Sequence, residues 1–298
     1  TPQSTDLSRR RHLGGWLAAA AALGTSALGG TALRRVAEGP RLRTVTVPLP
    51  GLPPQLDGFT IVQLTDLHLG ATLQADFARN VVEVTNSLSP DLVAVTGDLV
   101  DGEVHRIAEL VAPLAELRAT HGVYFVTGNH DFYSDVEPWL EFVRARLGWR
   151  VLANERVRIG DDNTHFELAG VHDYAAGRFG QRWAPNLPKA LDGWRGDSAL
   201  VLLAHQPLAV LEAARHKVDL VLSGHTHGGQ IWPWGHLVRL QQPVVEGLAR
   251  FGDTRIYVSP GTGYWGPPMR LGTRSEITRI VLRSVPRGAP LPDAKVEA

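Results

Sequence analysis

The run Thr60-Ile61-Val62-Gln63-Leu64-Thr65-Asp66-Leu67-His68 joins a short apolar segment to polar residues that follow it directly. Apolar runs of about four to eight residues are typical of strands that are buried on both faces of a sheet. Asp66 and His68 are two residues apart, so on an extended segment their side chains project on the same side. This stretch therefore predicts a buried strand that presents a carboxylate and an imidazole at its carboxyl end.

Four more apolar runs end in the same way. They cover residues 92–95, 123–126, 200–203 and 220–222, and they are followed by Asp98, Asn129, His130, His205, His225 and His227. Between them, residues 75–88, 104–118 and 208–215 have apolar positions at helical spacing. Strands that alternate with helices predict an α/β fold, in which ligands gather at the carboxyl ends of the strands.

The composition narrows the chemistry that the chain can perform. Its 298 residues include 30 basic and 30 acidic side chains, 12 histidines and no cysteine. Hydrophobic residues make up 44% of the chain, which is enough for a core and excludes wholesale disorder. The lack of cysteine excludes disulfides, thiol catalysis and cysteine-bound zinc or iron–sulfur sites. Histidine, the commonest metal ligand, is abundant.

The charge is distributed unevenly along the chain. Residues 1–43 carry a net charge of +5, because seven arginines stand against two acidic residues, and the remainder carries −5. A mildly acidic body argues against a nucleic-acid-binding surface. A basic N-terminal segment is typical of chains that are directed to a membrane.

The N-terminal segment has the pattern of an export signal. The residues Ser8-Arg9-Arg10-Arg11-His12-Leu13 precede an uncharged stretch from Leu13 to Leu33 that is rich in Ala and Gly. They resemble the twin-arginine signal Ser-Arg-Arg-x-Phe-Leu, with His12 in the place of Phe. The resemblance implies the twin-arginine export machinery as a partner, and export across the bacterial cytoplasmic membrane to the periplasm or the cell surface. The alternatives are a signal for ordinary secretion and an uncleaved membrane anchor, since residues 13–33 reach the roughly 20 residues of a bilayer span.

These patterns divide the chain into four parts. We expect a signal or anchor at residues 1–33, a proline-rich linker at 34–54, a folded domain at 55–285 and a flexible tail at 286–298. Within the linker, residues 44–47 are a candidate for a first edge strand.

The polar residues at the strand ends have the chemistry of metal ligands. A single histidine at a strand end is usually structural, but here five loops each deliver one or two ligand atoms to one rim. The set comprises Asp66, His68, Asp98, Asn129, His205, His225 and His227. It is too large for one tetrahedral ion, and it suits two ions of the Mn, Fe or Zn kind that share a carboxylate.

The spacing of these residues resembles a known family. The blocks are Asp66-x-His68, Gly97-Asp98-x-x-Asp101, Gly128-Asn129-His130-Asp131, His205 and Gly224-His225-x-His227, and together they resemble the signature of the calcineurin-like metallophosphoesterases. The resemblance implies a four-layer α/β/β/α sandwich of two mixed sheets. It also implies two metal ions and hydrolysis of a phosphoester by a hydroxide that bridges them.

The resemblance assigns a role to each residue of these blocks. Asp66, His68 and His227 would hold the first metal, Asp98 would bridge, and Asn129, His205 and His225 would complete the second. His130 would protonate the leaving oxygen or stabilise charge on the phosphate. Asp101 and Asp131 would be hydrogen-bonded to these groups without binding metal themselves, and Asp131 would orient His130. The alternative for both carboxylates is that they cap turns.

A narrower resemblance concerns the exported phosphodiesterases of this family. It rests on the N-terminal signal, on Gly170-Val171-His172-Asp173 and on residues 261–270. It implies substrate contacts from His172, Tyr264, Trp265 and Arg270, where the aromatic rings would stack on substrate and the guanidinium would pair with a phosphate oxygen. The alternatives are a turn around His172 and closure of the core by Trp265.

We therefore expect a dinuclear-metal phosphoester hydrolase, with an exported phosphodiesterase favoured and an envelope phosphodiester or phospholipid as substrate. Twin-arginine export moves folded proteins, so the metals would be loaded in the cytoplasm, which favours Mn or Fe over Zn. One alternative is a hydrolase of a lipid-linked pyrophosphate of the UDP-diacylglucosamine type. The other is a non-catalytic metal-binding scaffold.

Overall fold

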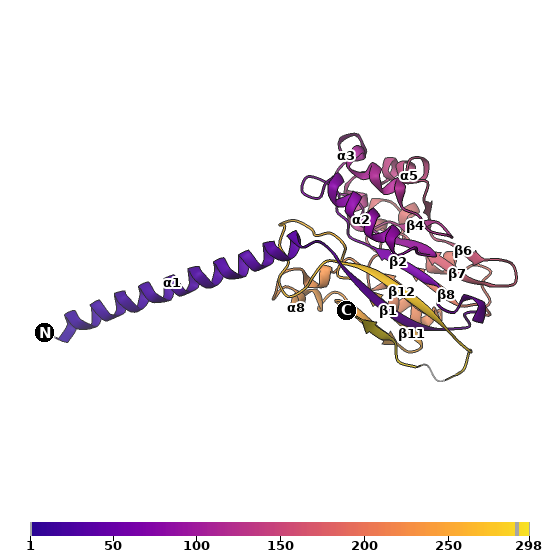
Figure 1. Cartoon of the computed structure of the whole chain (residues 1–298). Coiled ribbons are helices and arrows are strands. Elements are labelled where there is room, and N and C mark those ends of the chain that lie inside the picture. Colours follow the sequence, from indigo (N-terminus) through magenta and orange to yellow (C-terminus); the bar gives the residue numbers. More distant parts are fainter. Residues whose placement is uncertain (1, 290–291, 298) are drawn as a thin grey trace.

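The computed structural model describes residues 2–289 and 292–297, and for residues 2–8 it describes the backbone alone. Helix α1 (Pro2–Ala37) extends away from a layered body that contains the rest of the described chain (Figure 1). Its stretch Arg9–Ala37 is long and apolar enough to cross a membrane: an 18-residue window of it has a mean hydropathy of 1.3, and 6% of that window is buried.

Two mixed sheets form the centre of the body. The first has the order β13-β1-β12-β2-β3-β4-β5 and the second β10-β11-β9-β8-β7-β6. The strands of the first are β1 (Arg41–Pro50), β2 (Thr60–Leu64), β3 (Leu92–Thr96), β4 (Val123–Val126), β5 (Arg150–Val151), β12 (Glu276–Val285) and β13 (Lys295–Glu297). Those of the second are β6 (Glu155–Gly160), β7 (His165–Gly170), β8 (Leu200–Leu203), β9 (Leu220–Ser223), β10 (Gly247–Phe251) and β11 (Thr254–Val258).

Helices cover the outer faces of both sheets. The α-helices of the body are α2 (Ala75–Ser87), α3 (Val104–Val111), α4 (Asn129–Tyr133), α5 (Val136–Ala145), α6 (Leu187–Ala190), α7 (Ala209–Arg215) and α8 (Gly235–Val238). Short 3-10 helices lie at Pro54–Leu56, Ala112–Glu116, Ala176–Phe179, Gln181–Trp183 and His227–Gly229. The helical spacing predicted for residues 104–118 is divided in two, because Pro113 cannot continue α3 and the chain tightens into a 3-10 turn.

Three apolar clusters separate four layers. One lies between the first sheet and α2, α3 and α5, a second between the two sheets, and a third between the second sheet and α6 and α7. Strand β8 shows the pattern most clearly, because Val201 and Leu203 join the middle cluster whereas Leu200 and Leu202 join the outer one. A strand with both faces buried reads as continuous apolar sequence. The predicted α/β/β/α sandwich is confirmed.

The topology brings the predicted strand ends together. Strands β2, β3 and β4 pair in parallel, as do β8 and β9, so their carboxyl ends lie at common edges. The side-chain amide of Gln63 on β2 ties the two edges, because Nε2 donates to Thr96 Oγ1 at 3.0 Å and to the carbonyl of Ser223 at 2.9 Å.

Residues 34–54, where the sequence predicts a linker, are part of the fold. Helix α1 continues to Ala37, and β1 pairs along its whole length with β12. The alternate residues Val45, Val47 and Leu49 are fully buried between the sheets, and this burial outweighs the proline-rich composition. Strand β1 is also not the edge of the sheet.

That edge is formed by the tail, for which the sequence predicts flexibility. Lys295–Glu297 form β13, which pairs antiparallel with Thr44–Thr46. Residues 290–291 and 298 of the tail lie outside the described residues.

Candidate metal centre

The loops after β2, β3, β4, β8 and β9 converge on one site. Several of its residues have an unusual backbone: Asp66, His68, Asp98, His225 and His227 all have positive φ, between 44° and 72°. Non-glycine residues rarely adopt this left-handed region because of its steric cost, and such strain concentrates at functional sites.

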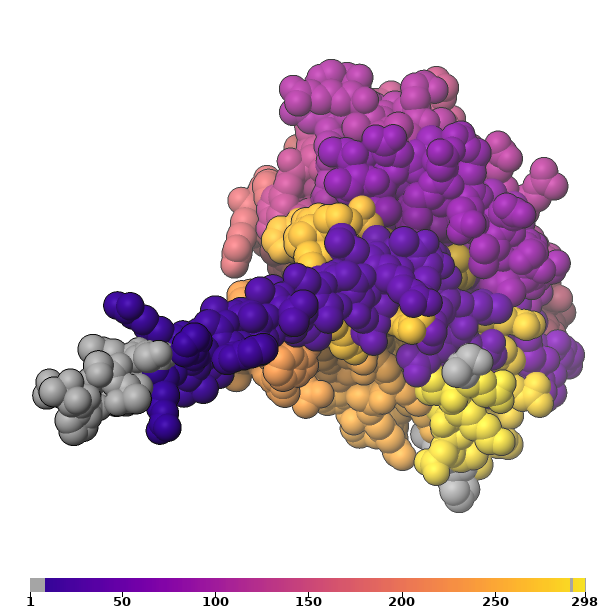
Figure 2. Space-filling view, turned by 60° about the vertical axis from the view of Figure 1, so that its left-hand side comes forward, coloured from indigo at the N-terminus to yellow at the C-terminus, as the bar shows by residue number. Residues whose placement is uncertain are grey.

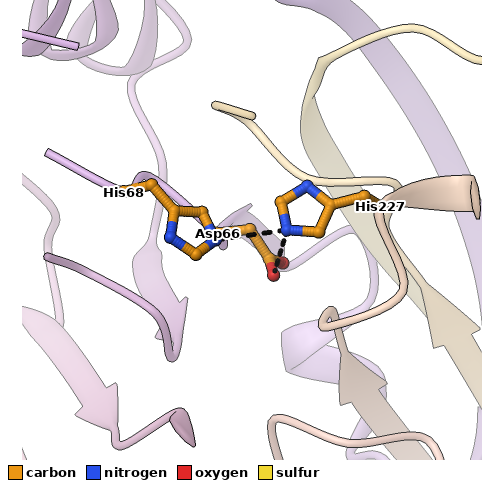
Figure 3. A group of neighbouring side chains, drawn as sticks. All are labelled: Asp66, His68 and His227. Atoms are coloured by element: carbon orange, nitrogen blue, oxygen red, sulfur yellow. Dashed lines mark hydrogen bonds and ion pairs between the residues drawn. The ribbon is translucent and has the colours of Figure 1, made fainter. Parts of the chain in front are cut away.

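One group of ligand atoms comes from Asp66, His68 and His227 (Figure 3). Nε2 of His227 lies 3.3 Å from Oδ1 of Asp66 and 3.2 Å from Nε2 of His68. All three residues are buried, and the carboxylate of Asp66 accepts hydrogen bonds from Thr65 Oγ1 and from the backbone N–H of His225. Two imidazole nitrogens and a carboxylate oxygen that face one another have the chemistry of a cation-binding site.

A second group comes from Asp98, His205 and His225. Nδ1 of His205 donates to the carbonyl of Thr96 at 2.8 Å, which leaves Nε2 facing Oδ2 of Asp98 at 3.1 Å. The same Oδ2 lies 3.7 Å from Nε2 of His68, a ligand of the first group. Asp98 therefore stands between the two groups, as a carboxylate shared by two ions would.

One further atom at this place tests whether metal ions fit. Asn129 Oδ1 is buried without a hydrogen-bond partner among the residues that the structure describes. Buried polar atoms are nearly always paired, so this oxygen points to a partner beyond the protein atoms. An amide oxygen is a metal ligand, and with the imidazole nitrogens and carboxylates around it the donor set fits two ions of the kind expected from the sequence.

The pKa values of the candidate ligands are shifted in both directions. Burial lowers the pKa of His225 to about 3 and that of His227 well below its usual value, so both imidazoles are neutral at neutral pH. Burial would raise the pKa of Asp98, but the neighbouring imidazoles of His205 and His68 hold it well below the usual range.

Two other candidate ligands are shifted toward their protonated forms. Burial opposes protonation of His205, but the carboxylate of Asp98 outweighs it and raises the pKa of His205 well above its usual value. Burial raises the pKa of Asp66. Neutral imidazoles and ionised carboxylates are the forms that bind metals, so binding of cations would release protons from these two groups.

Glycines allow the loops to approach closely. A Cβ on Gly128 would collide with the carboxylate of Asp98, and a Cβ on Gly224 would collide with that of Asp66. Neither glycine has positive φ. They are required for space, because the backbone of one loop packs directly on the carboxylate of the next.

Asp101 connects the ligand cluster to His130. Its Oδ2 accepts from Nδ1 of His68 at 3.1 Å, and its Oδ1 accepts from Nδ1 of His130 at 2.7 Å. Burial opposes ionisation of Asp101, but hydrogen bonds from the two imidazoles outweigh it and lower its pKa to about 2. Burial likewise opposes protonation of His130, but the hydrogen bond to Asp101 outweighs it and raises the pKa. This carboxylate fixes both rings.

The sequence assigned the orientation of His130 to Asp131, and the structure places Asp131 elsewhere. The Asp131 carboxylate is buried and accepts from the backbone N–H groups of Gly128, Asp98 and Leu99 at 2.7, 3.1 and 2.9 Å. Burial raises its pKa to about 7. Asp131 sits at the start of α4, where a carboxylate most readily accepts from free N–H groups, and it joins the loops after β3 and β4.

A cavity of about 620 Å³ opens beside the ligands. Asp98, Asn129, His130, His225 and His227 form its base, and Gln230, Ile231, Trp232, Trp234, Trp265 and Pro267 form its walls. The sequence patterns did not point to Gln230, Trp232 or Trp234 as site residues. The signal that could have predicted these tryptophans is the run Ile231-Trp232-Pro233-Trp234, which follows His227 closely and has two tryptophans beside a proline.

Comparison with known proteins agrees with this geometry. The family described as calcineurin-like phosphoesterase matches residues 59–229, more than half of the chain. The chain belongs to this family. The match runs from the start of β2 to just past His227, and therefore includes all the loops that form the ligand cluster.

Relatives of this phosphoesterase occur in distant organisms. A transmembrane protein with metallophosphoesterase domain from Bos taurus is 42% identical over 90% of this chain and 63% of its own length. An uncharacterized metallophosphoesterase from Helicobacter pylori is 44% identical over 74% of this chain and 59% of its own. The chain thus spans about three fifths of these relatives. Among solved structures, the NAD nucleotidase of Haemophilus influenzae is 16% identical, with a TM-score of 0.47, over 75% of this chain and 56% of that one.

Of the predicted substrate contacts in this phosphoesterase, the structure places only Trp265 in the cavity. Its ring lies 5.7 Å from that of His130, and its backbone exchanges two hydrogen bonds with the side chain of Gln230. Tyr264 points the other way and is buried in the apolar cluster beneath α2 and α5. Of the two aromatic rings, Tyr264 is therefore part of the core and Trp265 reaches the cavity.

Arg270 and His172 also lie away from the cavity walls. The fully buried guanidinium of Arg270 donates to the carbonyls of His227, Pro260 and Gly263, and burial lowers its pKa to about 10. Arg270 thus holds the loop of His227 and is not exposed to a substrate phosphate. His172 is buried against Phe132 and Trp183, and burial lowers its pKa to about 4.

Proposed function

We propose that this chain is a dinuclear-metal phosphoester hydrolase with a preference for phosphodiesters. The observation that carries the proposal is the position of Asp98, which stands between two groups of buried ligand atoms. The preference for diesters is supported by the cavity, because its volume of about 620 Å³ and its three tryptophans offer room and apolar contacts for a second ester substituent.

Each ligand residue has a part in this proposal. Asp66, His68 and His227 would hold one ion, Asn129, His205 and His225 the other, and Asp98 both. When bound, such a pair of ions activates water at neutral pH and neutralises charge on the phosphate. The ions are Mn or Fe rather than Zn if the protein folds and is loaded in the cytoplasm, and metal analysis of the protein expressed in each compartment tests this.

His130 is the proton donor in this proposal. Its Nδ1 is held by Asp101, so Nε2 is the remaining ring nitrogen, and the residue lines the cavity beside Asp98. The raised pKa keeps a larger fraction of the imidazole protonated near neutral pH. An imidazolium in this position can donate its proton to the leaving oxygen, which is ordinary general acid catalysis.

Helix α1 is the membrane anchor in this proposal. Its length, its mean hydropathy and its exposure support this role, as does the transmembrane protein among the relatives. Export through the twin-arginine machinery, to the periplasm or the cell surface, remains a prediction from the sequence. A fusion of a reporter to the C-terminus, with Arg9 and Arg10 each replaced by Lys, tests the export route.

The hydrolase is tested with two chromogenic substrates. Bis-p-nitrophenyl phosphate and p-nitrophenyl phosphate are compared with Mn, Fe, Zn and Mg, using the full chain in detergent. We expect faster turnover of the diester, and a loss of at least about a hundredfold in Asp98→Ala, which removes the shared ligand. The matched control is Asp253→Ala, whose carboxylate is exposed on a turn. Monoester preference would make the protein a phosphatase, and activity retained in Asp98→Ala would refute the dinuclear site.

A further inference from the structure

Large apolar side chains are exposed around the mouth of the cavity. Trp232, Trp234 and Trp265 line the cavity, and Leu237 and Leu240 lie in and just after α8, within six residues of Trp234. Their exposed fractions are 65%, 62%, 53%, 51% and 81%, respectively. We call these five residues the apolar rim. A contiguous exposed apolar patch marks an interaction surface on a protein or a membrane.

The loop next to the apolar rim contacts the C-terminal end of α1. The backbone N–H of Arg270 donates to the carbonyl of Ala32 at 3.1 Å, and Cε of Met269 lies 3.9 Å from the position that a Cβ on Gly29 would take. The next residue, Leu271, accepts a hydrogen bond of 2.7 Å from the N–H of Trp232. In Figure 2 gold surface from the later part of the chain lies above the indigo helix where the helix meets the body, and orange surface lies below it.

These contacts fix the depth of the apolar rim relative to a bilayer. The uncharged stretch of α1 ends at Leu33, before Arg34 and Arg35. Gly29 lies four residues inside that end, or about 6 Å at the rise of an α-helix. If α1 spans a membrane, the loop that contacts Gly29 therefore lies at the boundary between headgroups and acyl chains. Tryptophan is enriched at this boundary because its ring is apolar and its N–H is polar.

Basic side chains lie at the same end of α1. Arg35, Arg41, Arg43 and Arg274 line a second cavity, of about 320 Å³, beside the start of β1, together with Glu246 and Glu276. Arg43 pairs with Glu276 at 3.5 Å and Arg274 with Glu38 at 3.0 Å, so the four arginines exceed these three acidic residues by one positive charge. Arginines next to a membrane-spanning helix attract anionic lipid headgroups. An apolar patch with a basic flank has the chemistry of a lipid surface and differs from a protein interface, whose core is depleted of charge.

We propose that the apolar rim is inserted into the membrane from which α1 extends, and that the cavity takes its phosphodiester substrate from a lipid in that membrane. This inference rests on the proposed function for the reaction and adds the class of substrate. The acyl chains of the lipid stay among the rim residues, and the headgroup phosphodiester reaches Asp98 and His130, which line the same cavity as Trp232, Trp234 and Trp265.

The absence of cysteine allows a direct test of insertion. In the full chain, Leu237→Cys and Leu240→Cys carry an environment-sensitive NBD label, and Leu211→Cys on α7 is the control, because Leu211 is also an exposed leucine (46%). Each protein is reconstituted in vesicles of phosphatidylcholine and phosphatidylglycerol that contain spin-labelled lipids. We expect quenching at 237 and 240 and little at 211. Equal quenching at all three positions would overturn the proposal. Disulfide-linked dimers of the unlabelled Leu237→Cys protein would also overturn it, because they would assign the surface to a second copy.

The substrate class is tested with Leu237→Ser/Leu240→Ser, since neither leucine lines the cavity. We expect this variant to hydrolyse bis-p-nitrophenyl phosphate at the rate of the unmodified chain, and phosphatidylglycerol in vesicles about tenfold or more slowly, because two apolar contacts with lipid are lost. Equal loss on both substrates, or none on the lipid, would overturn the inference. If the unmodified chain cleaves neither substrate with any metal, the proposed function fails, whereas the quenching experiment still decides whether the rim is inserted.

Discussion

Replacing Asp101 with Asn tests how the ligand cluster and the proton donor are held in place. The carboxylate of Asp101 accepts from Nδ1 of His68 at 3.1 Å and from Nδ1 of His130 at 2.7 Å, with a different oxygen in each case. Asn keeps the shape of the side chain but has a single acceptor oxygen, and its other position is an N–H₂ donor. One of the two imidazoles must therefore lose its partner or turn.

The expected loss of activity follows from the two hydrogen bonds that Asp101 accepts, one from a candidate metal ligand and one from the proposed proton donor. Loss of a carboxylate that orients a metal-bound histidine costs about 10–100-fold in metal affinity or activity. Loss of an oriented general acid costs about 10²-fold or more. We expect kcat/KM to fall at least about a hundredfold, which corresponds to ~2.7 kcal/mol of transition-state stabilisation.

The assay separates positioning from unfolding. Hydrolysis of bis-p-nitrophenyl phosphate is followed against pH, metal content is measured by mass spectrometry, and Asp253→Asn is the matched control. Asp101 holds the pKa of His130 up, so its replacement should move the alkaline limb of the kcat profile to lower pH, because the proton donor is lost earlier as pH rises. Turnover within about threefold of the unmodified protein, with an unchanged pH profile, would refute the reasoning.

Further predictions concern the close packing at Gly128, the buried guanidinium of Arg270, and the aromatic residues Tyr264 and Trp265. Gly128→Ala places a Cβ on the carboxylate of Asp98, so metal content should fall while the fold, measured by circular dichroism, persists. Arg270→Met leaves three backbone carbonyls without their buried donor and should lower the free energy of unfolding by about 3 kcal/mol, seen as a lower urea midpoint. Tyr264→Phe should leave KM for the diester unchanged, whereas Trp265→Ala should raise it several-fold; a larger change from Tyr264→Phe would contradict the buried position of that ring.

The sequence predicted the strands around the site well because burial on both faces leaves a strong local signal. Residues 92–95 and 220–222 are continuous apolar runs, and both form central strands with neighbours on each side. Strand β1 lacked this signal, because Pro48 and Pro50 are typical of linkers. Its partner β12 begins more than two hundred residues later, and no local pattern reveals such a distant pairing.

That the candidate ligand residues lie together was predictable, because one or two of them follow each strand and the spacing repeats. Their supporting groups were not. Asp101 and Asp131 each follow a ligand by a few residues, and the sequence cannot tell which carboxylate reaches His130. The choice depends on where the loop after β3 crosses the start of α4, which only the tertiary structure fixes. In the same way, the direction of Arg270 depends on three carbonyl groups brought together by different loops.

The left-handed backbone at the ligands connects stability to function. Asp66, His68, Asp98, His225 and His227 have φ values between 44° and 72°, and the left-handed region costs an L-residue roughly 1–2 kcal/mol. Five such residues would lower the stability of the fold by several kcal/mol if nothing compensated. The compensation comes from the surrounding hydrogen bonds, such as that from the N–H of Asp66 to the carbonyl of Gly97 at 3.0 Å and that from the N–H of His68 to the carbonyl of Asp98 at 3.1 Å. Bound cations would add to it, since anything that binds only the folded state stabilises that state. The strain therefore falls on five of the seven candidate ligand residues, and the sheets on either side are the rigid support that makes it tolerable.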